Sequence, residues 1–306
     1  MAKKKGNLIP YAMLIFSSVI WGFQPVCIKW LLEAWNPVTI TTVRYFLISI
    51  ILFVILYRRQ GRQIFPHKED IKWFVLMGLF GIFLNNVLQF SGLKETTVVN
   101  CTLISATSPA ITAFFAVFII RERLSLFSWI GIAVSFVGVL TVVSDGSWEV
   151  IRQIDFHVGD VLCFLSQISW AFYSFAALKV MRHVSVGVTT LWAGFCGAIF
   201  TLVYGSAVGE FQVSLLPPLP LLSFAYMAIL GGLLSIFFYN YAMNETGPSL
   251  ASIFLNIMPV VGMFSGFLVL SESIDVVQIA GALTIFIGVY WTTHGDFIAN
   301  RLLHRT

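Results

Sequence analysis

A small set of side-chain amides stands out because it lies within strongly apolar stretches of the sequence. Asn85, Asn86 and Gln89 occur together, and Tyr239 and Asn240 occupy a comparable stretch further along the chain. An amide without a partner in hydrocarbon costs several kcal/mol, so these groups must point toward protein or toward a ligand. The chemistry that they support is hydrogen bonding to a polar molecule. The alternative is that they join neighbouring helices to one another.

Further polar and aromatic residues in apolar stretches extend this candidate site. Gln24 lies beside Pro25, Asn256 lies one helical turn before Pro259, and an aromatic pair near residue 170 could form a wall for an amphipathic substrate. We predict as substrate-binding residues Gln24, Asn85, Asn86, Gln89, Ser105, Trp170, Tyr173, Tyr239, Asn240 and Asn256.

Two cations are candidate anion contacts. Arg44 lies about six residues into an apolar stretch, roughly 9 Å along a helix axis. It could extend toward the membrane surface, form a structural pair, or meet a substrate carboxylate. Lys29 follows another apolar stretch and could pair with Glu33 or attract anions.

The sequence offers little for catalysis or metal binding. Cys27, Cys101, Cys163 and Cys196 are far apart and belong to no Cys-x-x-Cys or Cys/His spacing. The sequence has no Gly-x-Ser-x-Gly or His-Glu-x-x-His motif. We therefore expect no enzyme activity, metal or cofactor, and a channel remains as an alternative class. Every Asp, Glu and His is expected near a helix end or in a loop, so facilitated transport or exchange fits at least as well as proton coupling.

Composition shows which elements must position these residues. Of 306 residues, 58% are hydrophobic and 10% are charged, whereas soluble proteins carry roughly 25% charged residues. Spanning helices need about 20 mostly apolar residues. The sequence predicts an all-α membrane protein with ten transmembrane helices, at roughly 9–30, 38–57, 72–93, 96–119, 126–143, 158–180, 187–208, 219–243, 249–270 and 276–294.

Basic residues predict the orientation of these helices. Lysine and arginine beside spans stay on the cytoplasmic side. With both termini inside, fourteen basic residues are cytoplasmic and three are external. The basic residues are scattered over several segments, which argues against a nucleic-acid partner. The cytoplasmic set is Lys3, Lys4, Lys5, Arg58, Arg59, Arg62, Lys68, Lys72, Arg121, Arg123, Lys179, Arg182, Arg301 and Arg305.

The two halves of the chain match after a shift of 150 residues. Gly131 and Gly138 then meet Gly281 and Gly288, and Glu122 meets Glu272. Because each half has five spans, the second copy must be inverted. We predict a first repeat at 1–144, an external linker at 145–157 and a second repeat at 158–306. Inverted repeats are typical of secondary transporters.

A matched pair of prolines falls within this repeat. Pro109 and Pro259 lie near the centres of the fourth and ninth predicted spans. Proline disturbs the helix one turn earlier, and the freed carbonyls are tolerated only against protein or a watery cavity. We predict hinges at both positions beside a midplane site; a packing kink is the alternative.

These motifs resemble the EamA-type domains of the drug/metabolite transporter superfamily. The resemblance covers nearly the whole chain and rests in the first half on Trp21-Gly22, Lys29, Arg44-Tyr45, Ser108-Pro109, Arg121-Glu122-Arg123-Leu124 and Gly131. In the second half it rests on Ser169-Trp170-Ala171, Met258-Pro259, Ser271-Glu272 and Gly281. It implies a ten-helix exporter or facilitator of amino acids or related metabolites.

We therefore expect a secondary transporter of small polar metabolites that works by alternating access. An amino-acid exporter or facilitator leads, and a nucleotide-sugar or other phosphorylated-metabolite carrier is the alternative. The expected location is a bacterial cytoplasmic membrane, with both termini inside. The expected partners are the lipid bilayer and a small-molecule substrate, with the chain as a monomer or homodimer.

Overall fold

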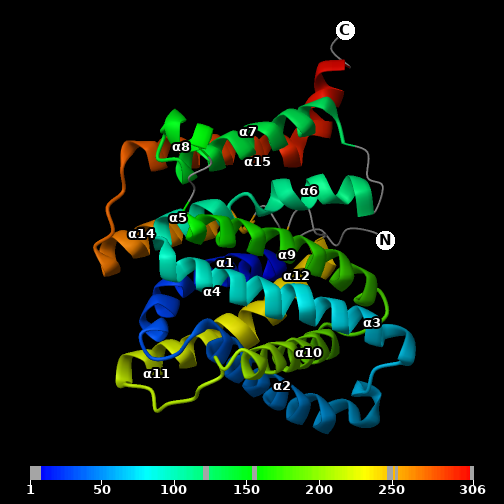
Figure 1. Cartoon of the computed structure of the whole chain (residues 1–306). Helices are drawn as coiled ribbons and strands as arrows, with labels where there is room; N and C mark the ends of the chain where they lie inside the picture. Colours follow the sequence, from blue (N-terminus) through cyan, green and yellow to red (C-terminus); the bar gives the residue numbers. More distant parts are fainter. Residues whose placement is uncertain (1–7, 120–123, 154–156, 247–250, 252–253, 304–306) are drawn as a thin grey trace.

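The computed structural model describes residues 8–119, 124–153, 157–246, 251 and 254–303. Within these ranges the secondary structure is helical, and no strand occurs there (Figure 1). Seven helices are long and apolar enough to cross a membrane, and three shorter apolar helices accompany them. The ten-helix membrane fold is thus confirmed. The basic residues Lys3, Lys4, Lys5, Arg121, Arg123 and Arg305, and Glu122, lie outside the described ranges.

The first half contains five spans, and two of them are interrupted. The third span combines α3, η2 and α4, and the fourth combines α5 and α6. The elements are α1 (Ile9–Leu32), α2 (Pro37–Gln60), η1 (Gly61–Ile64), α3 (Lys68–Met77), η2 (Gly78–Leu84), α4 (Asn85–Glu95), α5 (Val98–Ser105), α6 (Ser108–Ile119) and α7 (Leu126–Val143).

The second half repeats this pattern after a short helix in the linker, α8, which the sequence did not predict. The eighth span combines α11, η3 and α12. The elements are α8 (Trp148–Gln153), α9 (Val158–Val180), α10 (Val186–Ala207), α11 (Pro218–Ala225), η3 (Tyr226–Leu234), α12 (Ser235–Thr246), α14 (Ile257–Leu270) and α15 (Val276–Leu303).

Local capping fixes where several helices begin. Asn36 precedes α2 and accepts from the backbone N–H of Thr39 at 2.9 Å, while Pro37 occupies the first helical position. Thr97 caps α5 in the same way, accepting from the N–H of Asn100 at 3.0 Å. The carboxylate of Glu272, from the other half, accepts from two further N–H groups at the start of α5. The start of α5 is therefore held by both halves.

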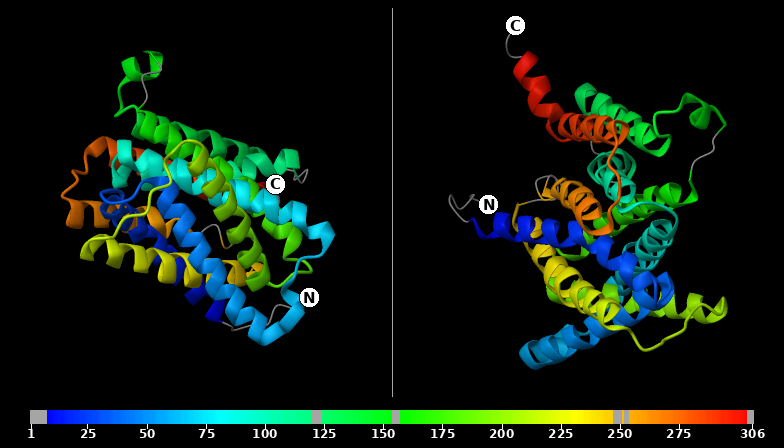
Figure 2. Two further views of the ribbon diagram at one scale, coloured as in Figure 1. Left: turned by 60° about the horizontal axis from the view of Figure 1, so that its bottom comes forward. Right: turned by 90° about the vertical axis from the view of Figure 1, so that its left-hand side faces the viewer.

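Equivalent helices of the two halves pack against each other in opposite directions. A Cβ on Gly131 of α7 would lie 2.6 Å from the Gly288 carbonyl oxygen, and a Cβ on Gly138 would lie 3.0 Å from the Gly281 oxygen. Early residues of α7 thus meet late residues of α15. Since these glycines are repeat equivalents, the two five-helix repeats are inverted. In Figure 1, α7 and α15 form one end of the molecule, and Figure 2 shows the same pair from two further sides.

The equivalent helices α2 and α10 also pack against each other, at the opposite end of the molecule (Figure 1). Gly187 of α10 faces Leu56, and Gly194 faces Ser49, so the two helices also run antiparallel. The hydroxyl of Ser49 donates to the Leu191 carbonyl at 3.4 Å. The remaining spans lie between these two antiparallel pairs, where they surround a cavity.

Two π-helical segments occupy equivalent places in the third and eighth spans. These are η2 and η3, and the sequence predicted uninterrupted helices at both places. A π segment leaves some backbone carbonyls without their usual donors, and such segments are frequent at functional sites. Side chains supply the missing donors here. The Asn86 amide donates to the Gly81 and Ile82 carbonyls, and the Trp21 indole donates to the Gly231 carbonyl at 2.8 Å.

The fourth and ninth spans are interrupted one turn before their prolines. The fourth has a turn at residues 106–107, and the ninth has a turn at 255–256. Pro109 and Pro259 then lie in the first turn of α6 and α14, where the missing N–H leaves no intrahelical bond unmade. Each proline therefore begins a new helix rather than bending a continuous one. Whether these breaks move as hinges stays a prediction.

Candidate functional site

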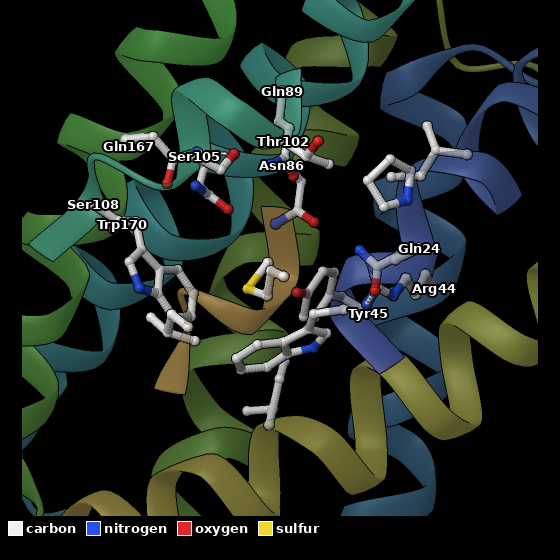
Figure 3. Close-up of a pocket in the computed structure, with 17 residues that line it drawn as sticks. Gln24, Arg44, Tyr45, Asn86, Gln89, Thr102, Ser105, Ser108, Gln167 and Trp170 are labelled. Atoms are coloured by element: carbon white, nitrogen blue, oxygen red, sulfur yellow. Dashed lines mark hydrogen bonds between the residues drawn. The ribbon is translucent and has the colours of Figure 1, made fainter. Parts of the chain in front are cut away.

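A cavity lies between the two halves, enclosed by α1, α2, α4, α5, α6, α9, α12 and α14 (Figure 3). Its empty volume is about 810 Å³, a figure that includes space open to solvent. The lining residues are Trp21, Gln24, Pro25, Ile28, Arg44, Tyr45, Asn85, Asn86, Gln89, Thr102, Ser105, Ser108, Gln167, Trp170, Ile236, Leu255 and Met258.

Arg44 is the one charged side chain among the described residues that line this cavity. It is only 2% exposed, and its Nη2 donates to the Gln24 Oε1 at 3.2 Å. Nε and Nη1 have no hydrogen-bond partner in the described part of the chain, and Arg44 forms no ion pair there. A buried charge without a counter-charge is strongly unfavourable. The guanidinium can therefore accept an anion from a ligand.

Glycines of η3 make room for this cation. A Cβ at Gly232 would lie 3.2 Å from the Arg44 Nε, and a Cβ at Gly231 would clash with the Gln24 amide oxygen. Larger residues at either position would displace the pair. The second half thus shapes a charged subsite whose side chains come from the first half, and Figure 3 shows Gln24 and Arg44 side by side with their hydrogen bond.

The three amides of α4 face the cavity from another side. Asn85 donates through Nδ2 to the Ser166 carbonyl at 2.8 Å, and Asn86 donates to the carbonyls of η2. For the side-chain oxygens of both residues, and for the amide of Gln89, no hydrogen bond to another described residue is found. These groups are oriented by the protein and retain acceptors for a ligand.

Ser105 reaches the cavity together with a residue that the sequence reasoning missed. Gln167 donates through Nε2 to the Ser105 Oγ at 3.1 Å, which links α9 to α5. A signal was available, because Gln167 lies three residues before Trp170 and so shares its helix face. The cavity lining also includes Thr102, Ser108 and Tyr45, which were not among the predicted site residues.

Aromatic rings close one side of the cavity. Trp170 lines it and stacks on Tyr173, with ring centroids 4.8 Å apart and planes inclined by 24°. Trp21 lies edge-on to Trp170 at 6.1 Å and contacts the ring of Tyr239 at 5.2 Å. Of these four residues, the two tryptophans face the cavity and the two tyrosines lie behind them.

Other predicted site residues also lie outside the cavity lining. Asn240 belongs to a separate buried cluster, where its Nδ2 lies 3.5 Å from the Tyr173 hydroxyl and 3.4 Å from the Thr190 Oγ1. Asn256 lies in the turn before α14, and its Oδ1 has no partner within the described ranges. Pro109 and Pro259 are buried in helix starts.

Lys29 lies away from the cavity as well. Its Nζ donates to the Thr96 carbonyl at 2.6 Å, and among described residues it forms no ion pair with Glu33. Both residues line a second hollow that also includes Lys94 and Glu272. Lys29 therefore ties α1 to the turn between α4 and α5.

Equivalent positions of the two repeats line the cavity with different chemistry. After the shift of 150 residues, Asn86 meets Ile236, Ser105 meets Leu255 and Ser108 meets Met258. All six residues line the cavity, polar in the first half and apolar in the second. At these three pairs of positions the first repeat therefore supplies polar side chains and the second supplies apolar ones.

A central cavity between two inverted five-helix repeats defines a membrane transporter. The EamA-like transporter family matches this chain twice, over residues 8–144 and 157–294, and the chain belongs to that family. The resemblance inferred from the sequence is thus confirmed.

Relatives cover almost the full length of the chain. The uncharacterized transporter YyaM of Bacillus subtilis is 29% identical over 280 residues, which are 91% of this chain and 92% of that protein. The uncharacterized inner membrane transporter YedA of Escherichia coli K12 is 24% identical over 301 residues, covering 95% and 93%. A solved crystal structure with 17% identity covers 97% of this chain and 99% of its own, with a TM-score of 0.64, and shares the fold.

Proposed function

We propose that the cavity binds small polar metabolites that carry a carboxylate, with amino acids as the leading class, and that the chain exports or facilitates them by alternating access. The observation that carries this proposal is the buried, unpaired guanidinium of Arg44 in a cavity lined by both repeats. A substrate carboxylate supplies the missing counter-charge. Amide oxygens in the cavity lining can accept from a substrate ammonium group.

The mixed chemistry of the lining refines the substrate. A lining that combines polar with apolar and aromatic side chains suits an amphipathic molecule. The alternative is a nucleotide sugar or another phosphorylated metabolite, which brings two or more negative charges. Arg44 alone would leave at least one of those charges unmatched, so the geometry favours a single carboxylate.

The charge bias between loops supports the proposed orientation. With both termini inside, fourteen basic residues fall on the cytoplasmic side and three on the outer side, a bias that supports this orientation. The relatives named as transporters, one of them an inner membrane transporter, agree with a location in the cytoplasmic membrane.

Counterflow in proteoliposomes tests the proposal. Vesicles are loaded with one unlabelled compound, and uptake of the same labelled compound is followed, over a panel of amino acids, other carboxylates, sugar phosphates and nucleotide sugars. We expect saturable, trans-stimulated uptake of an amino acid. Uptake of a nucleotide sugar with no response to any amino acid would overturn the leading assignment, and flux without saturation would indicate a channel.

A further inference from the structure

Asp160 is a buried carboxylate within the membrane domain. The sequence places it at the start of a span, and no coupling role was assigned to it. In the structure it is the third residue of α9 and is only 1% exposed. The backbones of α4 and α9 touch beside it, because a Cβ on Gly92 would lie 2.6 Å from the Gly159 carbonyl oxygen. The carboxylate is therefore enclosed by helix contacts.

Its hydrogen bonding is incomplete. Oδ1 accepts from the Thr96 Oγ1 at 2.5 Å, whereas Oδ2 is buried without a partner within hydrogen-bond distance in the described part of the chain. The Asn100 side chain of α5 also contributes hydrogen bonding to the carboxylate, at longer range. The Thr96 carbonyl accepts from the Lys29 ammonium at 2.6 Å, so Thr96 links α1 to the carboxylate on α9. An acidic group near a helix N-terminus is ordinarily a stabilising surface feature, which explains neither the burial nor the open oxygen.

The groups that face Asp160 are few. Lys29 approaches from α1 through Thr96. The Cys163 thiol on α9 interacts with the carboxylate electrostatically, and the Asn100 side chain faces it from α5. His157 and Asp145 also act on it electrostatically from the preceding segment. The side chains of both are exposed to solvent.

A row of residues on one face of α9 leads from Asp160 toward the cavity. Asp160, Cys163 and Gln167 share one face of α9, at spacings of three and four residues. Cys163 lies 2.8 Å from the Cys101 sulfur on α5, and Gln167 donates to Ser105 at the end of α5. The α5 helix ends at the break before Pro109. A change at Asp160 can therefore reach the cavity through the contact between α5 and α9.

We propose that Asp160 is the proton-binding group that couples transport to a proton gradient, an inference that rests on the chain being a transporter. The carboxylate takes up one proton from one compartment and becomes a neutral carboxylic acid. The loss of charge weakens its hold on Thr96 and so loosens α9 from the turn between α4 and α5. The proton leaves to the other compartment after the change of state, so charge and atoms balance.

The test separates proton coupling from transport itself. Counterflow at equal pH on both sides reports exchange, and uptake under an imposed pH difference reports coupling; both use the labelled compound of the panel that the wild-type protein exchanges. For one proton per uncharged substrate, a difference of about one pH unit supports about a tenfold concentration ratio. We expect this response in the wild-type protein. Asp160→Asn should keep counterflow and lose the response.

Two controls guard against a merely structural effect. Asp145→Asn changes an exposed carboxylate nearby and should keep the wild-type response, and Asp160→Glu should restore part of it. Pyranine trapped inside vesicles of the wild-type protein should report a change in internal pH when the transported compound is added without a gradient. This measurement does not depend on any variant folding.

The outcomes are distinguishable. Absence of counterflow with every compound overturns the proposed function. Counterflow together with a silent pyranine signal, or with an Asp160→Asn response equal to that of the wild type, overturns the role of Asp160 alone. If Asp160→Asn lowers stability but its uptake still responds to the pH difference as in the wild type, then Asp160 is a structural residue at the helix end. That result also refutes the inference.

Discussion

Replacing Arg44 by glutamine should weaken substrate binding without destabilising the protein. The side chain is 2% exposed, and two of its three nitrogens lack partners in the described ranges. Most buried arginines are paired, and removing them leaves another charge uncompensated. Here Arg44→Gln removes a charge that has no ion-pair partner among the described residues. The apparent unfolding temperature of the substrate-free protein should therefore not fall.

The size of the binding effect follows from the bonds that a carboxylate would make. Hydrogen bonds to charged groups contribute about 1.5–3 kcal/mol each. Loss of one such bond corresponds to about a tenfold to hundredfold rise in KM for counterflow. Arg44→Lys keeps the charge but not the planar set of donors, so its KM should lie between those of the wild type and Arg44→Gln.

The assay combines counterflow kinetics with thermal unfolding in detergent. Arg59→Gln is the matched control, because Arg59 lies on the same helix and is exposed at its end. It should leave both KM and unfolding temperature at wild-type values. A fall in the unfolding temperature of Arg44→Gln with an unchanged KM would show that Arg44 stabilises the fold, and the argument for an anion subsite would fail.

Three further predictions test the cavity, the scaffold and the orientation. Gln167→Leu removes the donor that links α9 to α5, and we expect a lower initial rate of counterflow with unchanged unfolding temperature; an unchanged rate would remove Gln167 from the site. Gly288→Ala should lower stability by about 1–3 kcal/mol, because the added Cβ meets the backbone of Ser135 on α7, and its KM should stay at the wild-type value; an unchanged unfolding temperature would contradict the close packing. Ser271→Cys and Arg59→Cys, each made in a cysteine-free protein, should react with an impermeant maleimide from outside and from inside the cell, respectively; reaction of both from one face would contradict the inverted topology.

Apolar composition was sufficient to predict the spans, because lipid requires about 20 apolar residues for each crossing. The repeat could be predicted as well. Gly131 and Gly281 recur at equivalent positions because two backbones touch there and no side chain fits. The π-helical segments could not be predicted from the sequence. Their residues are as apolar as those of an ordinary helix. The side chains that donate to their free carbonyls lie elsewhere: Trp21 belongs to α1, and Asn86 lies in the first turn of α4.

The candidate site was only partly accessible to sequence reasoning. Gln24, Asn86 and Trp170 line the cavity, as a polar or aromatic residue deep in an apolar stretch suggests. Tyr239 and Asn240 carry the same signal but do not line the cavity, because Tyr239 packs behind Trp21 and Asn240 lies in a separate buried cluster. The sequence does not fix the rotation of a helix that is apolar on most sides. Asp160 was assigned to a span end, yet the close approach of two glycines buries it. Burial of that kind depends on which helices become neighbours.

The two repeats keep the same scaffold but divide the chemistry of the cavity. Glycines that set helix contacts are retained in both copies, whereas Arg44 corresponds to Gly194 and Ser105 corresponds to Leu255. In an alternating-access cycle the halves exchange conformations, but they cannot exchange side chains. Under the proposed function, we therefore expect the charged end of a substrate to stay with the first repeat in both states. A substrate with a fixed orientation needs only one strong polar anchor, and Arg44 is the residue that we propose for this role.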